Sequence, residues 1–305
     1  MQKAAPEPKK PAGDADPNAD EKPPVAITIF DASGAPVRAL RGTNEEGVNR
    51  VAWDLRWDPT EQVHLRSTPD GNPHVWEEKR FRGKEARPVI YYGVDERIEG
   101  PLVVPGTYTV KLEFEGKEHT TTVEVLKDPN SAGTPEDVAA SAQLSYAIYK
   151  DIDETARMIN QLEWTRRQLD ELKKMLEAQK ADKSLLSARD ELETKVRSVE
   201  DQLLQPSLAE EDQKSFRGPL KLYLKLVWLQ AEVGTGRADV SGGADFAPTQ
   251  AEKEVYALLH GQLEQARADF RTLYDATIPA FNEAMRSQGL LRLIPVREVQ
   301  PRFPR

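Results

Sequence analysis

Two different spacings of apolar residues divide the chain. From Val25 to Leu126, apolar and polar residues alternate in short runs separated by turn signals, which is typical of antiparallel strands. From Thr134 onward, apolar residues recur every three or four positions, which predicts long amphipathic helices. The sequence therefore predicts a multidomain chain, β then α, in four parts: a disordered linker (1–24), an Ig-like β-sandwich of the fibronectin-III type (25–127), an elongated antiparallel helical bundle (134–290) and an extended C-terminal tail (291–305).

The predicted sandwich begins with an alternating strand, Val25–Phe30, and a turn signal at residues 31–34. A third strand is expected over residues 47–55, and a hairpin over residues 107–112 and 120–126. One face of the third strand is expected to enter the sandwich core: Val51, Trp53 and Leu55.

A long irregular stretch, residues 56–104, interrupts the predicted sandwich. Insertions of this length in a small domain are usually functional or packed against a neighbour. Its aromatic residues are therefore candidates for ligand binding. The alternative is that they pack against the helical domain, because large aromatic side chains usually bury themselves. The candidates are Trp57, Trp76, Tyr91 and Tyr92.

The first predicted helix begins after Thr134, a good N-cap that Pro and two acidic residues follow. Its apolar stripe runs to Leu176, which predicts a helix of roughly 45 residues. A second helix has apolar residues at heptad spacing, as in a coiled coil, and ends at Leu203. A fourth begins at Thr249, and Pro279 is expected to kink it because proline removes a backbone donor.

The third predicted helix, about residues 214–232, is apolar on nearly every side. A helix without a polar face is buried in a bundle or covered by another domain. We therefore expect it to contact a partner. The interface candidates are Leu222, Leu226, Trp228 and Leu229.

Charged residues of the first helix are expected on its solvent side. The pairs Arg166-Arg167 and Lys173-Lys174 alternate with Glu163, Asp170 and Glu171, and salt bridges between successive turns explain this pattern.

Composition excludes several classes of function. The net charge of −9 argues against a nucleic-acid partner, because that binding needs a basic face. The chain has no cysteine, which excludes disulfides and thiolate chemistry. No apolar run reaches the roughly 18 residues of a membrane-spanning helix, and residues 1–24 lack the apolar core of a signal peptide.

Candidate chemical groups do not converge in the sequence. The spacing of His64, His74 and His119 gives no geometry for a metal site. Asp95-Glu96 and Glu99 could form a glycosidase carboxylate pair, but flanking glycines favour a solvated hairpin turn. We predict no catalytic set, no metal and no cofactor.

Several motifs of the strand region resemble a known domain. They are residues 29–34 (IFDASG), 47–54 (GVNRVAWD) and 105–110 (PGTYTV). These resemble the Ig-like domain of flagellar hook assembly proteins. With Asp128-Pro129, the long helical segment and Pro248-Thr249, the order is similar to the C-terminal region of large bacterial proteins with sortilin-like or BNR-repeat β-propellers, often labelled glycosyl hydrolases.

This resemblance implies a periplasmic or extracellular location and an upstream β-propeller as partner. Any sialidase-like catalytic residue would lie in that propeller, so none is carried over to this chain. We expect a non-catalytic structural or interaction module that binds the propeller or another protein. The alternative is a carbohydrate-binding accessory domain with a glycan ligand; a stand-alone hydrolase is the third hypothesis.

Overall fold

The structure is a computed structural model that describes residues 25–69, 72–91, 94–95, 99–205, 220–234, 245–287 and 293. These residues form two compact units. Unit one contains the chain up to Asp54 together with Thr107–Glu124, and unit two contains Leu55–Gly106 together with the chain from Val125 onward. The predicted linker 1–24, and all of the predicted tail except Leu293, lie outside the described residues.

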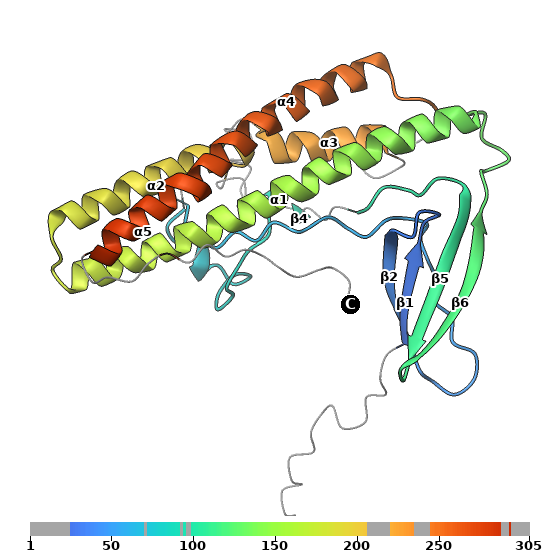
Figure 1. Cartoon of the computed structure of the whole chain (residues 1–305), viewed down its shortest axis with the longest axis horizontal. Coiled ribbons are helices and arrows are strands. Elements are labelled where there is room, and N and C mark those ends of the chain that lie inside the picture. Colours follow the sequence, from blue (N-terminus) through green and yellow to red (C-terminus); the bar gives the residue numbers. More distant parts are fainter. Residues whose placement is uncertain are drawn as a thin grey trace, which may run out of the picture. The chain divides into compact units, whose positions relative to one another are not determined.

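Unit one is a four-stranded antiparallel sheet (Figure 1). Its strands are β1 (Val25–Phe30), β2 (Pro36–Gly42), β5 (Gly106–Phe114) and β6 (Lys117–Val125), in the order β2-β1-β5-β6. The predicted turn after β1 is present, because the Asp31 carboxylate accepts hydrogen bonds from the N–H groups of Ser33 and Ala35, both over 2.9 Å. These hydrogen bonds outweigh the effect of burial and lower the pKa of Asp31.

The expected third strand is not formed. Residues 47–54 make no ladder with any described strand and instead cross one face of the sheet. A Cβ atom on Gly42 would lie 3.2 Å from Val51 Cγ2, and the Trp53 ring meets the Tyr108 ring edge-on at 5.3 Å. Contact with the face of the sheet thus replaces pairing at its edge. The described residues confirm a β region followed by an α region, whereas the second sheet of a sandwich is not seen among them.

Unit two contains the helices. They are α1 (Pro135–Ala178), α2 (Lys183–Leu203), α3 (Leu222–Val233), α4 (Gln250–Thr272) and, after a π-helical turn, α5 (Ile278–Ser287). The start of α1 is the predicted one: Thr134 Oγ1 accepts from the Asp137 N–H over 3.1 Å, and Asp137 accepts from the Thr134 N–H over 3.0 Å. This capping box satisfies two backbone donors that a helix end leaves open.

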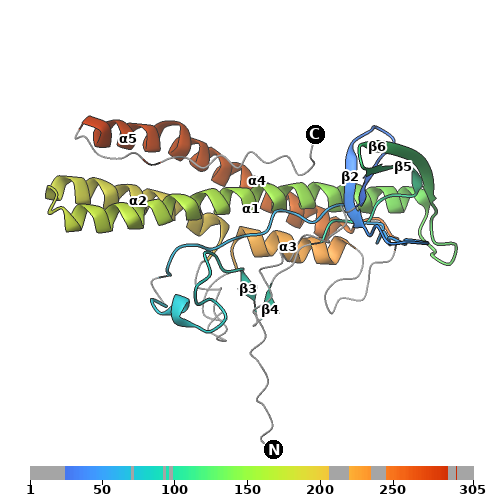
Figure 2. The same ribbon diagram turned by 90° about the horizontal axis from the view of Figure 1, so that it is seen from below.

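The helices lie along α1 in two directions. Ion pairs of α1 with α2 join Arg166 to Glu193 and Asp170 to Arg189, so the two helices are antiparallel. Helix α3 follows α2 along α1 in the same direction (Figures 1 and 2), and the Ser141 hydroxyl donates to the Val233 carbonyl. Helix α4 runs parallel to α1, since its residues pair with α1 in increasing order: His260 with Asp151, Arg267 with Glu154 and Tyr274 with Thr165. The core between them is mostly Leu, Ile and Val.

The helix that contains Pro279 is irregular just before the proline. Residues Leu273–Thr277 form a π-helical turn, in which the Ile278 N–H donates to the Leu273 carbonyl five residues earlier. Proline has no backbone N–H to donate, and a wider turn before it adapts the helix to this missing hydrogen bond. The structure thus shows a widened turn before Pro279, whereas the kink expected there stays a prediction.

The long insertion folds with the helices. Residues 55–106 belong to unit two, whereas the sequence pattern had placed them inside the strand domain. The two ends of the insertion meet, since the Trp57 N–H donates to the Pro101 carbonyl over 3.0 Å. Gly100 is required there, because a Cβ atom would lie 2.1 Å from the Trp57 carbonyl oxygen. Between these ends lie a short 3-10 helix (Val75–Glu77) and the two-residue strands β3 (Ile90–Tyr91) and β4 (Val94–Asp95).

Candidate functional site

An extended segment of the insertion, residues 57–67, lies along α1; we call it the strap. Three polar side chains of α1 bind its backbone. Asp153 accepts from the Glu61 N–H over 2.7 Å, and the Asn160 amide accepts from the His64 N–H over 2.7 Å. The other end of the Asn160 amide donates to the Gln62 carbonyl over 2.8 Å. The strap thus runs parallel to α1, and a helix supplies the partners that a neighbouring strand would otherwise provide.

Glu163 fastens the end of the strap. Its carboxylate accepts from the Ser67 N–H over 2.6 Å and from the Ser67 hydroxyl over 2.7 Å, and it also accepts from the Arg66 N–H. The Glu163 side chain is completely buried. A carboxylate is buried only with such hydrogen-bond partners. Without them, moving the charge out of water costs several kcal/mol of folding free energy.

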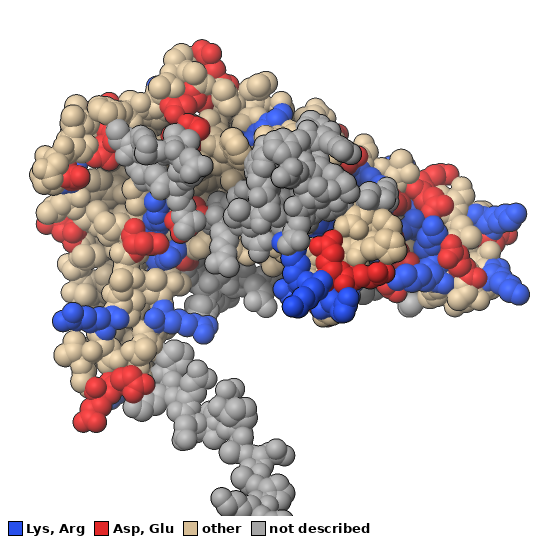
Figure 3. All heavy atoms as spheres, turned by 180° about the vertical axis from the view of Figure 1, so that it is seen from behind, with Lys and Arg blue, Asp and Glu red and all other residues tan. Residues whose placement is uncertain are grey.

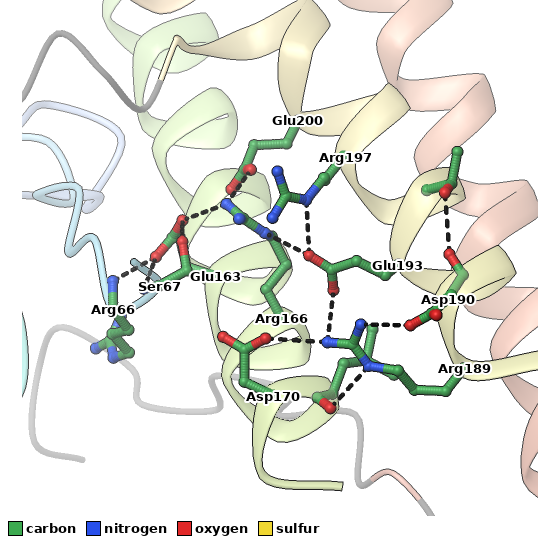
Figure 4. A network of polar contacts seen from close by, with 12 residues as sticks. Arg66, Ser67, Glu163, Arg166, Asp170, Arg189, Asp190, Glu193, Arg197 and Glu200 are labelled. Carbon is green, nitrogen blue, oxygen red and sulfur yellow. Dashed lines mark hydrogen bonds and ion pairs between the residues drawn. The ribbon is translucent and has the colours of Figure 1, made fainter. Parts of the chain in front are cut away.

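Behind Glu163 lies a buried network of charges between α1 and α2 (Figure 4). Arg166 is 2% exposed and contacts three carboxylates, those of Glu163, Glu193 and Glu200. Its Nη1 donates to Glu200 over 2.6 Å and to Glu163 over 3.3 Å. One guanidinium therefore links the strap carboxylate to the second helix.

The network continues through a second arginine. Arg189 donates to the Leu169 carbonyl and to Asp170, both over 2.9 Å, and so joins α2 to α1. The Glu193 carboxylate accepts a hydrogen bond from Arg197 Nε over 2.8 Å, and its other oxygen lies 3.7 Å from Arg189 Nη2. The residues that alternate in charge are Glu163, Arg166, Asp170, Arg189, Glu193, Arg197 and Glu200.

Burial and neighbouring charges shift the pKa values of the two innermost carboxyls, Glu163 and Glu200, in opposite directions. Burial raises the pKa of Glu200, and the negative charge of Glu163 raises it further, to well above its ordinary value. Burial also disfavours the charged form of Glu163, but hydrogen bonds from Glu200 and Ser67 and the charge of Arg166 outweigh it and lower the pKa of Glu163. The two carboxyls are coupled, and both shifts favour a state in which one proton lies on the Glu200 side of the pair.

A second polar cluster joins α1 to α4. His260 Nδ1 lies 2.7 Å from the buried Asp151 carboxylate, and Tyr256 packs beside the imidazole with ring centroids 5.5 Å apart. Burial, followed by the nearby charge of Asp151, raises the pKa of Tyr256. In the part of the chain that the structure describes, no group of three or more His, Asp or Glu residues could hold a metal ion.

The structure places two of the aromatic ligand candidates against other residues of unit two. The Trp57 ring lies 4.7 Å from the Tyr146 ring of α1, centroid to centroid. The Trp76 Nε1 donates to the Thr68 hydroxyl over 3.1 Å. Both contacts correspond to the packing that the sequence offered as the alternative to ligand binding. Tyr91 belongs to β3, and Tyr92 lies outside the described residues.

The four interface candidates of α3 divide into two groups. Leu222, Leu226 and Leu229 are buried within unit two, where their own chain covers them. Trp228, by contrast, is 47% exposed. Only Trp228 among the four therefore presents a large apolar surface to a partner.

The buried network corrects the sequence-based interpretation of α1. Glu163 and Arg166 were expected on a solvent face, yet both are buried. A signal was present: Glu163 follows Ile159, and Arg166 follows Leu162, each by four residues, which places them on the same side of the helix as the apolar stripe. Pattern alone could not show that the strap and α2 cover that side.

Comparison with protein-family models, with curated proteins and with solved structures finds no match to this chain. No helix among the described residues is long and apolar enough to span a membrane. On the face shown in Figure 3, Lys and Arg spheres lie interspersed with Asp and Glu spheres. This mixed face is unlike the extended basic surface that a nucleic acid requires.

Proposed function

We propose that this chain is a non-catalytic structural and interaction module that binds an upstream β-propeller or another protein. The observation that carries this proposal is the use of the buried charges. Glu163, Arg166 and Glu200 bind one another and the strap backbone, so the groups that could have served catalysis instead join three segments of the chain. Such a network favours one arrangement of strap, α1 and α2 over others.

The surface proposed for the partner lies on α3 and α4. Val233 of α3 is level with Ser141 of α1, and His260 of α4 is level with Asp151. Trp228 lies five residues before Val233, and Val255 lies five residues before His260. Because α3 runs antiparallel to α1 and α4 runs parallel to it, both residues lie at the same level of α1. Their exposed fractions are 47% and 44%.

Val255 also lies on the correct flank of α4. Asp269 accepts a hydrogen bond from Gln202 of α2 over 3.0 Å, which shows that this flank of α4 faces α2. Val255 lies two heptads before Asp269 and so shares its flank. Because α3 continues the line of α2, we propose that Val255 and Trp228 belong to one exposed apolar surface, which is typical of an interaction site.

A photo-crosslinking residue at position 228, in cells that produce the protein natively, tests this proposal. We expect a covalent adduct with one defined polypeptide, which mass spectrometry would identify. Leu126, which is 74% exposed, is the control position and should give no such adduct. The proposal fails if position 228 gives no adduct beyond the level seen at position 126.

A carbohydrate-binding accessory domain is the second candidate. The supporting observation is that Trp57 and Tyr146, although packed against each other, are only half-buried, and that the Lys150 ammonium lies 5.1 Å from the Tyr146 ring. Sugars bind to aromatic faces, so glycan-array binding that Trp57→Ala abolishes would favour this function. Absence of binding to every glycan would eliminate it.

A further inference from the structure

A short basic segment lies in the insertion; we call it the basic loop (residues 79–87). Five of its nine residues are Lys or Arg and one is acidic, whereas the whole chain has 42 Lys and Arg against 51 Asp and Glu. Lys79, Arg82 and Lys84 are exposed. The basic loop is thus positively charged in a chain whose net charge is −9.

Carboxylates of the chain do not neutralise these three cations. Within the described ranges, Lys79, Arg82 and Lys84 form no ion pair, and the Arg82 guanidinium donates to the Glu77 carbonyl over 2.8 Å instead. Like charges that lie close together repel one another, and a bound anion removes this repulsion. The basic loop is therefore a candidate for binding an anion from outside the chain.

Two further arginines lie over one indole beside the basic loop. Arg66 of the strap and Arg167 of α1 have their Cζ atoms 4.4 Å and 5.6 Å from the centroid of the Trp164 ring. All three side chains are half-buried. These cation–π contacts hold the two guanidiniums at one place on the surface of unit two.

Hydrogen bonds to the backbone connect the basic loop to this pair of arginines. Arg167 Nη1 donates to the Glu85 carbonyl over 3.3 Å, and the exposed side chain of Lys84 starts beside this contact. At the end of the loop, Arg87 exchanges backbone hydrogen bonds of 2.8 and 2.9 Å with Leu65 of the strap. The loop, the strap and α1 therefore bring Lys84 to the same region as the two arginines.

The guanidinium of Arg167 is suited to a carboxylate. Its other N–H groups make no hydrogen bond within the described part of the chain. They lie in one plane, and this geometry matches the two oxygens of a carboxylate. Because Arg66 lies over the Trp164 ring, the indole face that it covers is closed to a sugar ring. The site therefore suits a charged ligand better than a neutral one.

We propose that Arg66, Lys84 and Arg167 form a binding site for an acidic segment of a protein partner. Carboxylates of the segment would bind the edges of the guanidiniums and the Lys84 ammonium. Lys79 and Arg82 extend the positive charge along the basic loop, which fits a run of Asp and Glu side chains better than a single small anion. A nucleic acid needs a more extended basic face than these residues provide.

This site lies apart from the surface proposed at Trp228 and goes beyond the proposed function. Trp228 is level with α1 between Ser141 and Asp151. Trp164 comes 13 residues after Asp151, which is about 20 Å further along the helix. Binding at one surface can therefore fail while binding at the other remains.

The test is the fluorescence anisotropy of a labelled oligoglutamate peptide, titrated with the full chain at several salt concentrations. We expect saturable binding that weakens as salt rises, because salt screens ion pairs at a partly exposed site. Arg167→Gln should weaken binding about tenfold, since it removes a planar cation from the site. The corresponding oligoglutamine peptide should not bind.

Two variants separate the site from the overall charge and from folding. Arg286→Gln makes the same change of charge on α5, where the side chain is 73% exposed, and should leave the affinity within about twofold. Glu85→Gln removes the acidic residue of the basic loop and should tighten binding, which a folding defect cannot do. Circular dichroism should confirm that all three variants fold.

The proposal is overturned if the oligoglutamate peptide does not bind, or if Arg286→Gln weakens binding as much as Arg167→Gln. Competition with sodium polyphosphate distinguishes the two kinds of anion. Unlabelled oligoglutamate should displace the labelled peptide at a lower concentration of charges than polyphosphate does. The reverse order would assign the site to phosphate and overturn the assignment to carboxylates.

Discussion

The Ser67 hydroxyl donates a hydrogen bond to Glu163 Oε1 over 2.7 Å, although the two residues are 96 positions apart. The Ser67 N–H donates to the other oxygen of the same carboxylate over 2.6 Å. This pair joins the end of the strap to the middle of α1 and makes Glu163 the point where strap and charge network meet.

Glu163→Gln should lower the free energy of unfolding by about 3–5 kcal/mol, because it leaves Arg166 in a buried site with one carboxylate fewer. Urea denaturation would measure the change. Glu171→Gln removes an exposed carboxylate from the same helix and should change the free energy of unfolding by less than about 0.5 kcal/mol. Equal effects of the two substitutions would show that the buried carboxylate contributes no more to the free energy of unfolding than an exposed one.

Glu200→Gln, the same chemical change on the other innermost carboxyl, should have a small effect. Burial and the charge of Glu163 raise the pKa of Glu200 well above its ordinary value, which favours the neutral carboxyl, and glutamine is a neutral group of similar shape. We expect the free energy of unfolding at neutral pH to change by no more than about 1 kcal/mol. A loss as large as that of Glu163→Gln would mean that Glu200 is ionised.

The pH dependence of stability should differ on the two sides of the ordinary glutamate pKa of 4.5. Above that value, up to the raised pKa of Glu200, the folded state binds more protons than the unfolded state, so the free energy of unfolding falls as pH rises. Below it, the lowered pKa of Glu163 has the opposite effect, and the free energy of unfolding falls as pH falls.

The Glu200→Gln variant separates these two effects. It should remove the decline on the alkaline side and leave the decline on the acid side. Urea midpoints at a series of pH values, for the unmodified chain and the variant, would show the difference. An unchanged alkaline decline would assign it to other groups.

Asn160→Asp should loosen the strap. The amide at this position both accepts from His64 and donates to Gln62, whereas a carboxylate cannot donate and would face the Gln62 carbonyl. This hydrogen bond is only partly buried, so its loss should cost about 1 kcal/mol. Hydrogen exchange should become faster at the His64 amide than in α1. Uniform acceleration along the whole chain would indicate global unfolding instead.

Thr249→Ala should destabilise the start of α4 by about 1 kcal/mol, because it removes the acceptor for the Glu252 N–H. Thermal unfolding would measure the change. Thr249→Ser keeps the hydroxyl and the capping box, so its melting temperature should stay close to that of the unmodified chain. If both variants melt alike, the capping hydrogen bond has no measurable effect.

Helix starts, helix lengths and turns could be predicted because their causes are local. Thr134 and Thr249 cap the helices that were expected to follow them, and Asp31 forms the expected turn, since each uses only residues a few positions away. The apolar stripe that ends at Leu176 predicted a helix of roughly 45 residues, and α1 has 44.

Sequence by itself thus determined the order of elements, β then α, together with the absence of cysteine chemistry. Only the tertiary structure decided that Val51 crosses the sheet instead of joining it, that the strap belongs with α1, and that Glu163 and Arg166 are buried. The physical reason is that periodicity shows which residues share a face of a helix or strand. Which segment covers that face depends on contacts between residues about a hundred positions apart, such as Ser67 and Glu163.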